Sequence, residues 1–237
     1  MLLAHGFTQT AQSWSPVQHL LRARGFDDIK AIDLPGHGSA DDVRADLWGS
    51  ADHLVAAGGR TTYIGYSMGG RVGLHAALAH PDEVERLVLI GATAGIDNAD
   101  ARAQRRTDDE LLADRIGTIG VEAFIDEWLQ NPLFAGLTPN QALREDRLHN
   151  TADGLASSLR LAGTGTQAPL WDRLIEISCP VLLLVGQHDQ KFRAIAERMA
   201  TALPNAELRA IDDAGHSVHL EQPERIVDAL VDWMAKD

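Results

Sequence analysis

Apolar runs alternate with amphipathic stretches along almost the whole chain of 237 residues. Short runs of apolar or β-branched residues are typical of buried strands, whereas apolar positions spaced three and four apart are typical of helices. Strands that are separated by helices pair in parallel through right-handed crossovers, so we expect an α/β fold with a mostly parallel sheet. The pattern predicts strands at Leu2–Ala4, Ile29–Asp33, Thr61–Gly65, Leu87–Ile90, Val181–Val185 and Leu208–Ile211, and helices at Ser13–Arg24, Asp41–Ala57, Ser67–Ala79, Lys191–Leu203 and Pro223–Lys236.

This alternation is interrupted between about Asp97 and Trp171, where the pattern predicts no strand. Charged helical stretches fill this part of the chain, among them Ala99–Arg115 and Val121–Gln130. A helical insertion on an α/β core often forms a lid over the site. We therefore expect a core made of residues 1–96 and 172–237, and a helical cap made of residues 97–171.

The composition excludes several classes of protein. Lys and Arg number 21 against 34 Asp and Glu, a formal net charge of −13, which argues against a nucleic-acid partner. A single cysteine, Cys179, rules out an internal disulfide and any zinc site built from several cysteines. No metal-binding pattern or phosphate-binding loop is present, so we expect no metal and no cofactor. With no apolar run long enough to cross a membrane and no signal peptide, a cytoplasmic protein without a membrane partner is expected; the oligomeric state is not predicted.

The first motif that indicates chemistry is Gly65-Tyr66-Ser67-Met68-Gly69, which lies between a predicted strand and a predicted helix. A serine on such a strained turn needs neighbours without side chains, and the helix that follows supplies backbone N–H groups and a positive dipole end. The alternative is a serine that only caps the helix, with glycines present for packing. A serine becomes a nucleophile or a base when a histidine shares its proton and a carboxylate orients that histidine.

The chain supplies both partners at later strand ends. Asp189 comes directly after one predicted strand, and His216 comes after the next. The order Ser67, Asp189, His216 is the order in which α/β-hydrolases carry their catalytic residues. Neighbouring residues of the same types remain alternatives: His188 and His219 for the histidine, and Asp212 and Asp213 for the carboxylate.

A second loop at this edge of the sheet is His5-Gly6-Phe7, after the first predicted strand. The backbone N–H groups of Phe7 and Met68 are expected to converge on a developing negative oxygen. Together with the turn at 33–38, these motifs resemble the α/β-hydrolase fold over essentially the whole chain. The resemblance implies the same fold here, with a helical lid insertion but without the antiparallel hairpin that usually precedes the His-Gly strand.

Arginines accompany these motifs. Arg71 comes four residues after the serine, three more arginines lie at helical spacing within Asn98–Arg106, and Arg147 comes later in the predicted cap. A guanidinium matches a carboxylate in a bidentate manner and stays charged. Arginines placed around a serine in an acidic protein therefore indicate a small anionic substrate, although composition alone does not separate pocket arginines from surface ones.

The segments named so far, with several lid segments, resemble one branch of the fold, the 2-succinyl-6-hydroxy-2,4-cyclohexadiene-1-carboxylate (SHCHC) synthases of menaquinone biosynthesis. Lids differ most between branches of this fold, which makes the lid segments the more specific part of the resemblance. It spans roughly residues 5–223 and rests on the Gly65–Arg71 and Asn98–Arg106 segments, on Trp128 with Pro132-Leu133-Phe134, on Arg147, Asn150 and Gly154-Leu155-Ala156, on Gly163-Thr164-Gly165, on Gly186–Phe192 and on Ala214-Gly215-His216.

This resemblance implies a lyase that eliminates pyruvate from 2-succinyl-5-enolpyruvyl-6-hydroxy-3-cyclohexene-1-carboxylate. Ser67, activated by His216 and Asp189, would remove a carbon-bound proton. A multiply anionic substrate would be held by the arginines and by aromatic residues that shape the pocket. The alternatives are a serine hydrolase, acting covalently on an ester or a C–C bond, and a ligand receptor with little catalysis. The substrate-binding residues that the resemblance implies are Arg71, Arg105, Arg147, Tyr66, Trp128 and Phe134.

Overall fold

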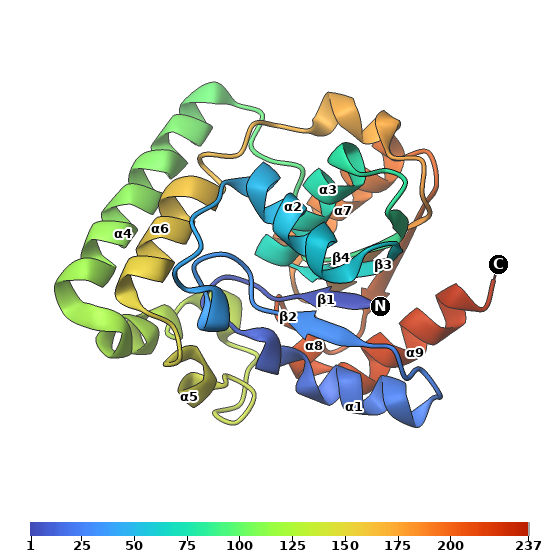
Figure 1. Cartoon of the computed structure of the whole chain (residues 1–237), viewed down its shortest axis with the longest axis horizontal. Coiled ribbons are helices and arrows are strands. Elements are labelled where there is room, and N and C mark those ends of the chain that lie inside the picture. The colour runs from blue at the N-terminus through green and yellow to red at the C-terminus, as the bar shows by residue number, and fades with distance from the viewer. Residues whose placement is uncertain (237) are drawn as a thin grey trace.

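Six parallel strands form one sheet in the order β2-β1-β3-β4-β5-β6 in the computed structural model, which describes residues 1–236 (Figure 1). The chain passes from β1 out to β2 and then returns to β3 on the other side of β1, so the winding direction reverses between β1 and β3. Ligands of parallel α/β sheets bind at such a reversal, outside the carboxyl ends of the strands. The strands are β1 (Leu2–Ala4), β2 (Lys30–Ile32), β3 (Thr61–Tyr66), β4 (Val84–Ile90), β5 (Val181–Gly186) and β6 (Ala206–Ile211).

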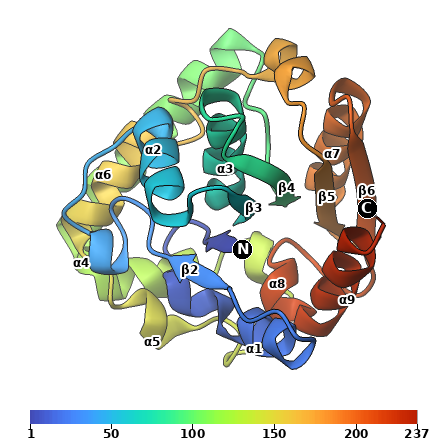
Figure 2. The ribbon, with the colours of Figure 1, turned by 45° about the vertical axis from the view of Figure 1, so that its right-hand side comes forward.

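Helices cover both faces of the sheet, because successive side chains of a strand point to opposite faces. Leu3 of β1 lies in the apolar core between the sheet and α1, α8 and α9. Leu2 and Ala4 lie in the core on the other face, between the sheet and α2, α3 and α7. Figure 2 shows α1, α8 and α9 together below the sheet and α2 and α3 above it. The elements are η1 (Ala11–Trp14), α1 (Ser15–Ala23), η2 (Gly38–Ala40), α2 (Leu47–Gly58), α3 (Met68–Ala79), α7 (Gln190–Ala202), α8 (Val218–Glu221) and α9 (Pro223–Met234).

The segment between β4 and β5 is helical throughout its regular elements, and α4 and α6 run side by side in both ribbon views. These two helices share an apolar cluster that includes Ile116, Phe124 and Leu155. The insertion therefore has a small core of its own beside the main sheet, while its exact limits at residues 97 and 171 stay a prediction. Its elements are α4 (Ala99–Trp128), η3 (Pro132–Phe134), α5 (Arg144–Arg147), α6 (Ala152–Ala162) and η4 (Trp171–Glu176).

One predicted helix boundary was wrong, and one predicted break between helices was confirmed. The helix expected at Asp41–Ala57 begins only at Leu47, because the Asp46 carboxylate caps it by accepting the N–H of Gly49 at 2.8 Å. The two cap helices expected at 99–115 and 121–130 are both present within α4, and Gly120, whose backbone is not helical, separates them. Gly120 has a φ of 78°, a conformation that glycine adopts without steric cost, so the first helix ends there and the chain bends into the second.

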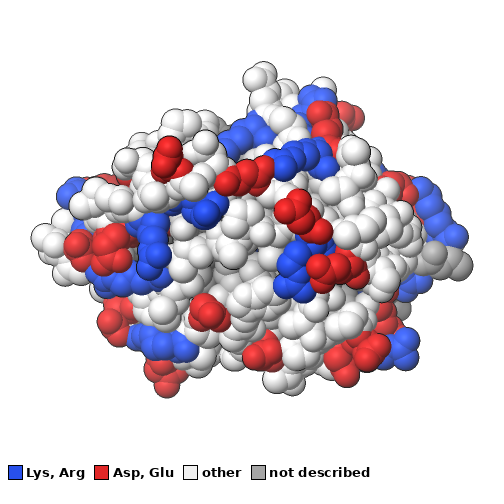
Figure 3. Space-filling model, turned by 90° about the horizontal axis from the view of Figure 1, so that it is seen from above, with Lys and Arg blue, Asp and Glu red and all other residues white. Residues whose placement is uncertain are grey.

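Charged side chains of both signs are mixed on the surface. On the face seen in Figure 3, Lys and Arg lie among Asp and Glu, and no extended basic patch is visible on that face. Several exposed arginines form ion pairs, among them Arg160 with Glu110 and Arg173 with Glu176. No helix within residues 1–236 combines the length and the apolar character that crossing a membrane requires.

Candidate active site

Ser67 occupies a strained turn between β3 and α3. Its φ is 50°, and its N–H donates to the Ile90 carbonyl at 2.8 Å. The glycines two residues away make this turn possible: a Cβ on Gly65 would collide with the Gly69 carbonyl, and a Cβ on Gly69 would collide with the Ala4 carbonyl. The serine hydroxyl is thereby presented at the carboxyl edge of the sheet, and within the described chain it makes no hydrogen bond of its own.

His216 and Asp189 form a buried pair beside this serine. The His216 Nδ1 lies 2.7 Å from the Asp189 Oδ2, and the two side chains are 5% and 7% exposed. The other Asp189 oxygen accepts the N–H of Phe192 at 3.2 Å, and the Phe192 ring lies 4.4 Å from the imidazole. The imidazole is thus fixed on one side by a carboxylate and on one face by an aromatic ring, and its Nε2 is left without a protein partner.

The structure separates this pair from the alternatives left by the sequence. Asp212 and Asp213 form surface ion pairs with Arg225, and the His188 side chain is exposed. His219 is fully buried, with the Tyr66 ring on one side at 4.2 Å and the Trp14 ring at 4.7 Å. Of the three candidate histidines, His216 is the one whose ring contacts Asp189 in the described structure.

The two expected oxyanion-binding N–H groups are free. Neither the Phe7 N–H nor the Met68 N–H donates to another residue in the part of the chain that the structure describes. The loop that carries Phe7 is tied to α3, because the Gly69 N–H donates to the His5 carbonyl at 3.0 Å. Its next residue, Thr8, has a φ of 68° and donates its N–H to the His37 Nε2 at 3.3 Å.

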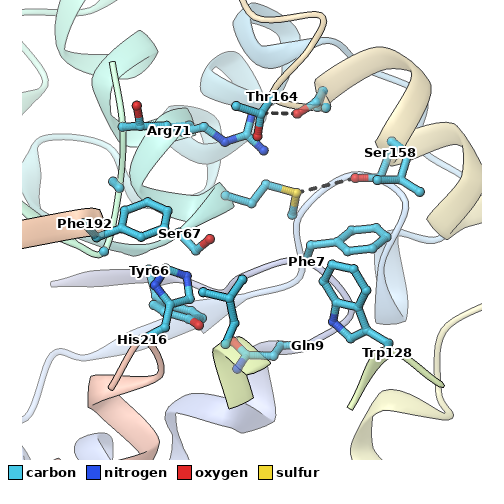
Figure 4. Close-up of a pocket in the computed structure, with 18 of the residues that line it drawn as sticks. Phe7, Gln9, Tyr66, Ser67, Arg71, Trp128, Ser158, Thr164, Phe192 and His216 are labelled. Atoms are coloured by element: carbon cyan, nitrogen blue, oxygen red, sulfur yellow. Dashed lines mark hydrogen bonds between the residues drawn. The ribbon is translucent and has the colours of Figure 1, made fainter. Parts of the chain in front are cut away.

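A cavity of about 860 Å³, counting the part that opens to solvent, lies above Ser67 (Figure 4). Every predicted site residue lines it except Asp189, which sits behind His216. The aromatic residues make one wall: the Trp128 ring lies 5.4 Å from Phe7 and 5.7 Å from Phe134. Tyr66 is buried beneath, with its hydroxyl 3.0 Å from the Ser217 Oγ.

Two of the predicted arginines are buried in this cavity without a carboxylate partner. Arg71 is 7% exposed and donates from Nη1 to the Ala162 carbonyl at 2.7 Å. Arg147 is fully buried; it donates to the Ala142 carbonyl at 2.8 Å and to the Thr8 hydroxyl, and its Nη2 has no partner. Burial lowers the pKa of each guanidinium to about 10, so both stay charged at neutral pH.

Arg105 differs from these two. It also lines the cavity, but its Nε donates to the buried Asp109 carboxylate at 2.7 Å, and its side chain is 40% exposed. Arg102 and Arg106, the other arginines of the same lid stretch, do not line the cavity. Part of the Arg105 charge is therefore neutralised within the protein, whereas the charges of Arg71 and Arg147 are not.

A family model described as "Alpha/beta hydrolase family" matches residues 1–229 of the chain. The chain belongs to the α/β-hydrolase family. A relative from Bacillus subtilis named "Putative 2-succinyl-6-hydroxy-2,4-cyclohexadiene-1-carboxylate synthase" is 39% identical over 92% of this chain and 84% of its own length. The SHCHC synthase of Salmonella typhimurium is 33% identical over 97% and 91%. The structure titled "Structure of MenH from S. aureus" matches with a TM-score of 0.89 at 30% identity, covering 99% of this chain and 92% of that one.

These findings confirm the fold class and the resemblance inferred from the sequence. This α/β-hydrolase carries Ser67 after β3, Asp189 after β5 and His216 after β6. Gly186 pairs with Ile211 in the sheet, so the loops that follow β5 and β6 leave it side by side and bring the carboxylate to the imidazole. Among residues 1–236 no group of three His, Cys, Asp or Glu side chains is placed to hold a metal ion.

Sequence reasoning missed several residues that line the cavity of this α/β-hydrolase. Gln9 lies two residues after Phe7, and Phe192 lies three residues after Asp189, so both were close to residues that had been singled out. The polar cap residues had no comparable signal, because their orientation depends on how α6 packs on α4. The lining side chains to which the sequence analysis assigned no role are Gln9, Ala92, Thr93, Leu133, Ser158, Leu159, Ala162, Thr164, Lys191 and Phe192.

Proposed function

We propose that this chain is an SHCHC synthase, a lyase that eliminates pyruvate from 2-succinyl-5-enolpyruvyl-6-hydroxy-3-cyclohexene-1-carboxylate. The observation that carries the proposal is the pair of buried guanidiniums, Arg71 and Arg147, that face the cavity of Ser67 and His216 without a carboxylate partner. A buried charge without a partner is costly, and a substrate with several carboxylates would supply the missing anions. The names of the relatives from Bacillus subtilis and Salmonella typhimurium support the same reaction.

In the proposed mechanism, Asp189 holds the His216 Nδ1–H, which leaves Nε2 as a proton acceptor. The Ser67 Oγ removes a carbon-bound proton from the substrate while its own proton passes to the His216 Nε2. The electron pair of the broken C–H bond moves through the ring, forms the new ring double bond and expels the enolpyruvyl oxygen. The enolate of pyruvate that is released takes up one proton on carbon, and His216 gives up the proton that it gained, so the free enzyme is regenerated and no acyl-enzyme intermediate is needed.

Negative charge that develops on the oxygen of the succinyl ketone needs stabilisation during proton removal. The Phe7 and Met68 N–H groups line the cavity beside Ser67 and have no protein acceptor. Preorganised backbone donors of this kind stabilise an oxyanion by several kcal/mol in a site from which water is excluded. We assign them to the enolate oxygen, with Arg71, Arg105 and Arg147 holding carboxylates and Tyr66, Trp128 and Phe134 shaping the pocket.

Hydrolysis of a small ester or of a C–C bond is the second candidate, because the same three residues activate a serine for covalent attack. A neutral ester leaves Arg71 and Arg147 buried without an anion, so the cavity favours the lyase. The proposed substrate is a small, multiply anionic molecule. A cytoplasmic location stays a prediction from the sequence.

The test is a coupled assay. The enolpyruvyl-cyclohexene substrate is generated in situ, and pyruvate release is followed together with the absorbance of the diene product, with short nitrophenyl esters in parallel wells. Wells without this protein give the rate of spontaneous elimination. Fast stoichiometric pyruvate release with negligible ester cleavage supports the lyase. Pyruvate release at the spontaneous rate, together with clear ester turnover, would refute it and favour the hydrolase.

A further inference from the structure

Gln9 is a buried polar residue to which the mechanism above gives no role. It is 1% exposed, it lines the cavity, and its Nε2 has no hydrogen-bond partner. The orientation of its amide is settled by a neighbour, because the Gly6 N–H can donate only to the oxygen and does so to Oε1 at 3.1 Å. The amide NH₂ is therefore turned away from Gly6 and keeps both of its donors.

Two further unpartnered donors belong to the same cavity. The Arg147 Nη2 and the Trp128 Nε1 are both buried without a partner, and both residues line the cavity. Arg147 also donates from Nη1 to the hydroxyl of Thr8, so its guanidinium lies against the segment that carries Gln9. Figure 4 shows Gln9 and Trp128 on one side of Ser67 and Arg71 on the other.

These three groups share one property: each can donate, and none can accept in the orientation observed. The other unpartnered polar atoms in the described chain include two acceptors, Asp146 Oδ2 and Gln167 Oε1, but neither residue lines the cavity. A buried donor that stays unpaired destabilises the protein, because it has lost its hydrogen bonds to water. Such a cluster is therefore complementary to a group with several acceptor sites. A carboxylate has about four lone-pair sites and no donor.

We propose that Gln9 is a substrate-binding residue that donates from Nε2 to a carboxylate of the anionic substrate, next to Arg147. This assignment rests on the proposed function, because the SHCHC synthase substrate supplies the carboxylate. Gln9 adds a neutral, geometrically fixed donor beside a charged one, which selects for the position of the carboxylate as well as for its charge.

Gln9→Glu tests this directly. The substitution keeps the shape and the acceptor for the Gly6 N–H, but it replaces the NH₂ with a carboxylate oxygen that repels the substrate. We expect KM for pyruvate release to rise on the order of tenfold to a hundredfold, with a smaller change in kcat. Gln12→Glu is the matched control, since Gln12 is exposed on the same segment and adds the same charge outside the cavity. Thermal unfolding of each variant verifies that it folds.

A binding experiment separates this proposal from the proposed function. Calorimetric titration with 2-succinylbenzoate, a stable aromatic analogue that keeps the ring carboxylate and the succinyl chain, does not require turnover. Weaker binding or a raised KM in Gln9→Glu, but not in Gln12→Glu, supports the carboxylate contact. Gln9-dependent binding by a protein that releases no pyruvate refutes the lyase and keeps the contact. If Gln9→Glu equals the wild type in both measurements, the assignment is wrong, and loss of stability in Gln9→Met would then make Gln9 a structural residue.

Discussion

Replacing Arg71 with methionine should make the protein no less stable while it removes most of its activity. Burial lowers the pKa of this guanidinium from 12.5 to about 10, which corresponds to about 3 kcal/mol of cost for keeping the charge in the cavity. The hydrogen bond to the Ala162 carbonyl returns about 1 kcal/mol of this cost. Methionine fills a similar volume without a charge, so the free energy of unfolding should stay unchanged or rise by up to about 2 kcal/mol.

The effect on catalysis has the opposite sign. If Arg71 pairs with a substrate carboxylate in the cavity, its loss removes about 2–5 kcal/mol of binding in the transition state. That range corresponds to a fall in kcat/KM of about thirtyfold to several thousandfold. Stability and activity should thus change in opposite directions in one variant, because the proposed function assigns substrate binding to the same unpaired charge that destabilises the free protein.

Pyruvate release coupled to lactate dehydrogenase measures the activity, and urea unfolding measures the stability. Arg106→Met is the matched control, since Arg106 is exposed and does not line the cavity. An Arg71→Met protein with wild-type kcat/KM would refute the role of this arginine. A variant that loses more than about 2 kcal/mol of stability would refute the cost assigned to its buried charge.

The remaining predictions concern the triad and the buried histidines. Ser67→Ala should lower kcat by several orders of magnitude while 2-succinylbenzoate still binds; retained pyruvate release would remove the serine from the mechanism. Asp189→Asn should lower kcat by about 10³–10⁴, because the amide favours the wrong imidazole tautomer; a fall of less than tenfold in the coupled assay would contradict this. Burial lowers the pKa of His37 to about 3 and that of His75 to about 4, so the unfolded chain binds protons that the folded chain does not. As the pH falls through 6.5 the unfolded chain takes up these protons and the folded chain does not, so the two histidines together should lower the free energy of unfolding by about 4 kcal/mol between pH 7 and pH 5; urea unfolding over this range checks this, and a flat profile would contradict it.

Local patterns in the sequence predict much of the fold. Short apolar or β-branched runs indicate most strands and helical periodicity indicates most helices, since each signal depends on residues only a few positions apart. The helix α2 shows the limit of this reasoning. The pattern is compatible with a helix from Asp41, but the Asp46 cap and the packing of the preceding turn start it at Leu47. The break between the two cap helices, by contrast, follows the pattern and lies at Gly120.

The motif and the chain order were enough to select Ser67, Asp189 and His216 as candidates, and their catalytic roles stay a proposal. The sequence by itself determined the turn that carries the serine and the strand ends that carry the carboxylate and the histidine. It also determined that arginines follow the serine and lie in the cap. The choice among His188, His216 and His219 required the pairing of β5 with β6, because that register decides which imidazole meets Asp189.

Only the tertiary structure decided which polar groups are left without partners. Arg71, Arg105 and Arg147 look alike in the sequence, yet Arg105 is paired with Asp109 and the other two are not. Gln9 shows no motif of its own, and its free amide follows from the fold of its loop against Gly6. Whether a polar side chain is buried, and whether it has a hydrogen-bond or ion-pair partner, depends on contacts between segments far apart in the chain. Such contacts leave no periodicity in the sequence that could predict them.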